Sequence, residues 1–98
     1  MSFEEFLAAP APAAGTTAPL AALWHDAHGE WERAHVCVQD DASREGAWVH
    51  AYLHRREGDE SNARYWYTRA GKTPPAKNVT LDAERAAIGA ALVESARM

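Results

Sequence analysis

Hydrophobic residues recur along this chain at steps of three and four positions, which is the spacing of one face of an α-helix. Between about residues 18 and 28, Leu20, Leu23, Trp24 and Ala27 fall on one such face. No segment alternates apolar and polar residues with a period of two, so strands are not expected. The pattern predicts an all-α protein.

A second helix is predicted to follow Gly29 and to run to about Asp40. Gly29 is suited to end the first helix because glycine adopts the left-handed conformation that closes helices. The acids Glu30 and Glu32 then lie at the positive end of the next helix, where negative charge is favourable. Its apolar stripe comprises Trp31, Ala34, Cys37 and Val38.

Two further helices follow the polar turn at Asp40, Asp41 and Ser43. The first of them is apolar around about two thirds of its circumference, so we expect it in the middle of the protein. Gly58 and Asp59 repeat the turn of a glycine followed by an acid. The helix after that turn carries a stripe of Ala63, Trp66, Tyr67 and Ala70.

The two ends of the chain are predicted as additions to this helical body. Ser2 and Glu5 form a capping box for a short helix, and residues 8–19 have the composition of a linker. Residues 1–19 are therefore assigned to a short N-terminal helix and a linker rich in Pro and Ala, and residues 20–98 to a single domain. A last helix starting near Thr80 or Asp82 is expected to cap the exposed end of the stack.

A faint internal repeat relates two parts of the chain at an offset of 29 residues. It places one set of positions, namely Ala22, His25, Gly29, Glu30 and Ala34, on a second set, namely Ala51, His54, Gly58, Asp59 and Ala63. Repeats of about this period are typical of stacked helical units. The sequence therefore predicts one helix-turn-helix unit built twice.

The stretch from Ala51 to Pro75 resembles a tetratricopeptide unit. Its ladder of Gly58, Ala63, Tyr67, Ala70 and Pro75 follows the pattern of that family, whereas the first unit departs from it by having Val38 at the aromatic position. The resemblance implies two antiparallel helical hairpins, flanked by the short N-terminal helix and the C-terminal capping helix. The segment WVHAYLHRREGDESNARYWYTRAG also resembles small bacterial proteins with no assigned activity, which adds no expectation about chemistry.

Composition limits the class of protein. Hydrophobic residues make up 47% of 98 residues and include four tryptophans, which is enough for the core of one small domain. Cys37 is the single cysteine and the start of the chain does not look like a secretion leader, so we expect a cytoplasmic protein. No apolar run approaches the roughly 20 residues of a bilayer span, so no membrane partner is expected.

Charge is distributed unevenly along the chain, whose net charge is −4. Residues 1–45 hold eight acids and two bases, a net charge of −6, whereas residues 46–98 hold eight bases and six acids, a net charge of +2. The basic half is suited to an acidic partner, but a pI of about 5.7 argues against a dedicated nucleic-acid binder.

Histidines supply the main candidate chemistry. His25 and His28 lie three residues apart on the first long helix, and His50 and His54 lie four apart on the third, with Glu57 nearby. In the tetratricopeptide arrangement these helices lie side by side, so the five residues are predicted to line a groove that binds a peptide or protein. The alternative is a metal or small-molecule site, with His50 and His54 as metal ligands.

Other reactive residues are assigned to structure. His35 borders the Trp31 stripe and is expected at the edge of the core, and Cys37 lies on the same buried stripe. No catalytic residue and no cofactor are predicted, because no nucleophile has an accompanying base and no phosphate-binding loop is present. A centre for acid–base chemistry built from His25, His28, His50 and Glu57 is the less favoured alternative.

A contact surface is predicted on the fourth long helix. Tyr65 points away from Trp66 and Tyr67 by at least 100°, so it lies outside the buried stripe together with the basic side chains of Arg64 and Arg69. Exposed aromatic and arginine side chains are typical of protein interfaces. A protein or peptide partner is therefore expected, with a second copy of this chain among the candidates.

Overall fold

The structure is a computed structural model that describes residues 2–96, and these residues form helices and no strands. The helices, in chain order, are α1 (Phe3–Ala8), α2 (Ala18–Ala27), α3 (Trp31–Val38), α4 (Arg44–Glu57), α5 (Glu60–Ala70) and α6 (Leu81–Ala96). The prediction of an all-α fold is confirmed. No helix in the described part is long and apolar enough to cross a membrane.

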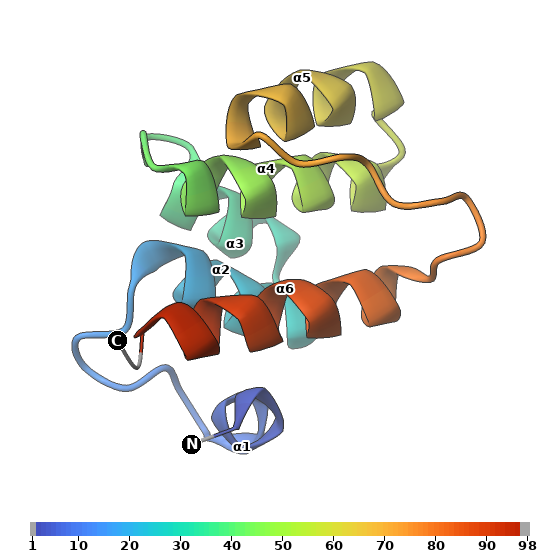
Figure 1. Ribbon diagram of the computed structural model, residues 1–98. Coiled ribbons are helices and arrows are strands. Elements are labelled where there is room, and N and C mark those ends of the chain that lie inside the picture. The colour runs from blue at the N-terminus through green and yellow to red at the C-terminus, as the bar shows by residue number, and fades with distance from the viewer. Residues whose placement is uncertain (1, 97–98) are drawn as a thin grey trace.

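Consecutive helices pack together around the two predicted glycine turns. Gly29 joins α2 to α3 with a φ of +77°, and Gly58 joins α4 to α5 with a φ of +88° (Figure 1). Both values are in the left-handed region, where a side chain would be strained. The two glycines therefore fix where each pair of helices reverses.

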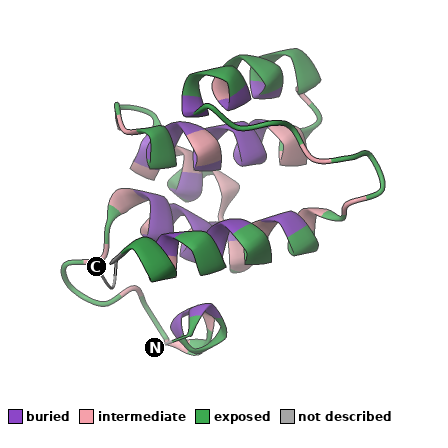
Figure 2. Ribbon diagram, viewed as in Figure 1, coloured by how far each residue is buried: buried purple, intermediate pink, exposed green. Residues whose placement is uncertain are grey.

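Helix α4 lies at the centre of the molecule, as its apolar surface predicted. It contacts α2, α3, α5 and α6. Its side chains at Val49, Ala51, Tyr52 and Leu53 are fully buried, and α4 is largely buried along its length (Figure 2). Of the other described helices, only α1 does not contact α4; it packs against α2 and α6 instead.

The last helix takes a different position from the one expected at the end of the stack. It packs against α1, α2 and α4, and Figure 1 shows it on the side of α4 opposite α5. Ile88 and Leu92 bury their side chains in this contact. Helix α6 therefore covers one side of the contact between α2 and α4, the side on which Ile88 and Leu92 are buried.

The N-terminal helix belongs to the same core as the rest. The capping box of Ser2 and Glu5 is present, and Phe3 and Phe6 are buried among residues of α2 and α6. A Cβ atom at Gly89 of α6 would lie 2.4 Å from the ring of Phe3, so glycine is needed for this approach. The Trp24 indole also donates a hydrogen bond of 3.1 Å to the carbonyl of Ala9, which ties the following segment to α2.

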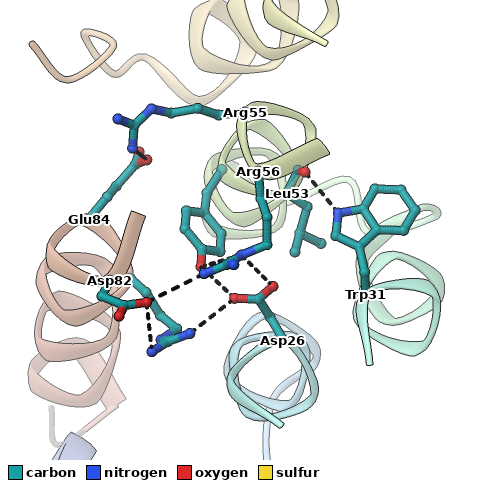
Figure 3. A network of polar contacts seen from close by, with 9 residues as sticks. Asp26, Trp31, Leu53, Arg55, Arg56, Asp82 and Glu84 are labelled. Atoms are coloured by element: carbon teal, nitrogen blue, oxygen red, sulfur yellow. Dashed lines mark hydrogen bonds and ion pairs between the residues drawn. The ribbon is translucent and has the colours of Figure 1, made fainter. Parts of the chain in front are cut away.

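A network of polar contacts between side chains of α2, α4 and α6 holds α6 in place (Figure 3). Its centre is Asp26, which is only 5% exposed. Arg56 Nε lies 2.9 Å from Asp26 Oδ1 and Arg85 Nη1 lies 3.4 Å from Oδ2, while the Tyr52 hydroxyl donates to the same carboxylate. Burial raises the pKa of Tyr52, so its hydroxyl keeps the proton that it donates.

A second buried carboxylate, Glu84, connects α6 to α4 and α5. Arg55 Nη1 lies 2.9 Å from Glu84 Oε1, and the Tyr67 hydroxyl donates to Oε2. Arg55 also donates to the carbonyl of Val79, just before α6 begins. Both carboxylates thus have an arginine and a tyrosine as partners, which satisfies charges that would otherwise be costly to bury.

Replacing Asp26 by Asn should therefore destabilise the protein. Arg56 and Arg85 would lose their buried counter-charge, and we expect the free energy of unfolding in urea to fall by about 3 kcal/mol. Asp82→Asn is the matched control, because Asp82 contacts the same two arginines but its side chain is 79% exposed. The Asp82→Asn substitution should lower the free energy of unfolding by less than about 1 kcal/mol. Equal losses in the two variants would contradict this account of the network.

Candidate metal centre

Three histidines from two helices meet between α3 and α4. His35 comes from α3, and His50 and His54 lie one turn apart on α4, so the two α4 rings project from the same side. One ring nitrogen from each histidine lies within 4.8 Å of the others. Nε2 of His35 lies 3.0 Å from Nε2 of His50.

Two tryptophans hold the histidine rings in place. Trp31 stacks on His35 with ring centroids 5.0 Å apart, and Trp66 of α5 stacks on His50 at 3.9 Å. The Trp31 indole donates a hydrogen bond of 2.8 Å to the carbonyl of Leu53 (Figure 3). This packing limits the rotation of the rings and keeps the three side chains together.

Glu57 orients the third histidine. Its Oε1 lies 2.7 Å from Nδ1 of His54. When Nδ1 donates its proton to the carboxylate, the lone pair of neutral His54 lies on Nε2. A carboxylate in this position is the usual outer partner of a histidine that binds a metal.

His50 has a buried nitrogen without a partner. Among the described residues no group hydrogen-bonds its Nδ1. If Nε2–H of His50 donates to Nε2 of His35, then Nδ1 of His50 is an unprotonated acceptor, which costs less than burying an unpaired N–H donor. This assignment places the His35 proton on Nδ1 and makes both rings neutral.

The surroundings keep His35 and His50 uncharged near neutral pH. Burial, together with the nearby His54 and His35, lowers the pKa of His50 to about 4. Burial and His54 also lower the pKa of His35. Neutral imidazoles have the lone pair that a metal ion requires, whereas imidazolium does not.

The structure brings together only part of the predicted histidine groove. His50, His54 and Glu57 share one site, but His25 and His28 have their contacts elsewhere. His25 Nδ1 lies 2.9 Å from Glu30 Oε1, and His28 Nε2 lies 3.0 Å from the carbonyl of Leu7. These two histidines stabilise the turn after α2 and the end of α1.

His35 is the site residue that sequence reasoning missed. It was expected at the edge of the core, and it is indeed only partly buried, but its ring faces His50. His35 lies on α3 and the other two histidines lie on α4, with an irregular turn between the helices. Their spacing along the chain therefore follows no helical period that could have identified the cluster. The one sequence feature that could have drawn attention to His35 is Trp31, which lies one helical turn before it and stacks on its ring.

A second group of possible ligands adjoins the first. Ligand atoms of His54, Glu57 and Asp59 also lie within 4.8 Å of one another. However, Asp59 is the N-cap of α5 and accepts a hydrogen bond of 3.3 Å from the Asn62 amide. Since Asp59 already caps a helix, the three histidines are the better donor set for a metal.

The predicted contact surface lies on the outer side of α5. Tyr65 is 53% exposed, whereas Tyr67 is buried, as the helical spacing predicted. Arg69 Nη1 donates a hydrogen bond of 3.1 Å to the Tyr65 hydroxyl, and Arg64 is exposed beside them. These three side chains form a small aromatic and basic surface, and Tyr65 and Arg69 both contact Trp66, which stacks on His50.

The depressed pKa of His50 predicts that acid destabilises the metal-free protein. Between pH 6.5 and about pH 4 the unfolded chain binds a proton at this position and the folded chain does not, so stability falls as the pH falls. We expect His50 to account for about 2 kcal/mol of the stability lost between pH 7 and 4.5. Urea unfolding of chelator-treated wild type and His50→Gln measures this difference. A loss as steep in His50→Gln as in wild type would disprove the assignment.

A scan against models of protein families, a search of curated proteins and a search of solved structures each found no match to this chain.

Proposed function

We propose that this protein binds a transition-metal ion of the zinc type through His35, His50 and His54. The single observation that carries the proposal is that one ring nitrogen from each of these three histidines lies within 4.8 Å of the others. Burial lowers the pKa of His50 and of His35, which leaves these ligands neutral. Imidazole is a common ligand of zinc, copper, nickel and iron.

The distances suit a small ion. Zinc binds imidazole nitrogen at about 2.0–2.1 Å, so two nitrogens of a tetrahedral site lie about 3.3 Å apart. The nitrogens of His35 and His50 are 3.0 Å apart, and a small rotation of either ring reaches the required spacing. The His50 proton would then move from Nε2 to Nδ1, so that the Nε2 lone pairs of both rings face the ion and both rings stay neutral. Glu57 supports His54 from behind, as an outer partner of a ligand does.

Binding would join the two helical pairs of the protein. His35 belongs to the pair of α2 and α3, whereas His50 and His54 belong to the pair of α4 and α5. A metal bound to all three adds a direct connection between the pairs. Three protein ligands leave one position of a four-coordinate ion for water or another small ligand.

Zinc titration of chelator-treated protein tests the proposal. We expect one zinc ion per chain by calorimetry and a change in tryptophan fluorescence, because Trp31 and Trp66 stack on ligand rings. Replacing His35, His50 or His54 by Ala should weaken binding at least about 100-fold, since a ligand is lost. Binding should also weaken as the pH falls toward about 4, because protons then compete with the ion for His50, whose pKa is about 4.

Two further variants separate this site from the predicted groove. Glu57→Gln should weaken zinc binding about 10- to 100-fold because it removes the outer partner of His54. The double variant His25→Ala with His28→Ala keeps all three ligands and should bind zinc as wild type does. Absence of stoichiometric zinc binding, or an equal loss in the double variant, would overturn the proposal.

We also propose that the protein binds a partner through the outer side of α5, and that this partner is a second copy of the chain. The tetratricopeptide resemblance favours a contact role, because stacked helical hairpins typically present binding surfaces. Tyr65 supplies exposed apolar area, and Arg64 and Arg69 supply positive charge. The net charge of −6 on residues 1–45 gives a second copy the complementary charge.

Sedimentation at low and high salt tests this association. We expect dimers at low salt that dissociate at high salt, because the contact depends on opposite charges. Tyr65→Ala with Arg69→Ala should weaken the dimer at least about tenfold. The control Lys72→Ala removes one positive charge from a side chain that lies over Trp48, outside both proposed surfaces, and should not. A protein that stays monomeric at low salt would exclude this partner.

A further inference from the structure

The segment between α5 and α6 forms a cavity with α5 and with Arg55 of α4. The cavity has a volume of about 360 Å³, which is within the range of small-molecule sites. Its apolar lining comes from Ala63 and Tyr67 of α5 and from Pro74 and Pro75 of the connecting segment. Adjacent prolines restrict the backbone, so this wall is largely formed before any ligand arrives.

The polar lining of the same cavity is mainly basic. Arg55, Arg64 and Lys77 contribute three positive charges, and Glu60 contributes one negative charge. The charge of Arg55 is already compensated by Glu84. Within residues 2–96, neither Arg64 nor Lys77 has a carboxylate oxygen within 4.0 Å. Arg64 and Lys77 therefore line a largely apolar cavity with their positive charges available to a ligand.

We propose that this cavity binds a small organic anion, with an acidic head group at Arg64 and Lys77 and an apolar body against Tyr67, Pro74 and Pro75. The charges select for the acidic group, and the apolar wall selects against an inorganic anion, which has no surface to bury there. The inference does not depend on the proposed metal site. Trp66, which stacks on His50, is not part of the cavity lining.

Three probes of matched structure separate the two parts of this site. 3-Phenylpropionate has both the carboxylate and the apolar body, 3-phenylpropionamide has the body without the charge, and inorganic phosphate has the charge without the body. In NMR titrations of the whole chain, with chelator present, we expect 3-phenylpropionate to bind at least tenfold more tightly than either of the others. The backbone signals that shift should be those of Ala63, Tyr67 and Lys77.

The double variant Arg64→Glu with Lys77→Glu should weaken 3-phenylpropionate binding at least tenfold while leaving the far-ultraviolet circular dichroism unchanged. Arg33→Glu with Arg44→Glu makes the same change in net charge at exposed positions outside the cavity and should bind as wild type does. No binding by wild type, equal binding of phosphate, equal binding of the amide, shifts confined to other residues, or an equal loss in the control variant would each overturn the proposal.

Discussion

The carboxylate of Asp26 lies between Arg56 and Arg85 and accepts from the Tyr52 hydroxyl, and this contact determines how α6 closes against α2 and α4. A buried charge is favourable only where its partners are correctly placed. Glu84 meets the same condition through Arg55 and Tyr67. The two carboxylates therefore add specific partners on α2, α4 and α5 to the apolar contacts that Ile88, Leu92 and Gly89 of α6 already make.

Closure by α6 also decides which surfaces are left for binding. On one side of the contact between α2 and α4, Ile88, Leu92 and the arginine contacts of α6 occupy the surface. The candidate binding residues described above lie on two other faces. One is the seam between α3 and α4 with its histidines, and the other is the outer side of α5 with its exposed aromatic and basic side chains.

The histidine cluster depends on the aromatic side chains around it. Trp31 and Trp66 stack on His35 and His50, and the same packing excludes water from the rings and lowers the pKa of both histidines. Neutral rings can approach closely, as the 3.0 Å contact between His35 and His50 requires, whereas two charged rings would repel. The tryptophans are thus part of the site as well as part of the core.

The sequence by itself determined the helices and their turns, because these depend on local causes: the periodic apolar stripes, the capping box of Ser2 and the left-handed glycines at Gly29 and Gly58. It also indicated His50, His54 and Glu57, which neighbour one another along a single helix. Only the tertiary structure decided where α6 packs and that His35 joins the cluster with His50 and His54. Both depend on which helices lie side by side, and that is set by distant partners such as Asp26 with Arg85, for which residue spacing along the chain contains no rule.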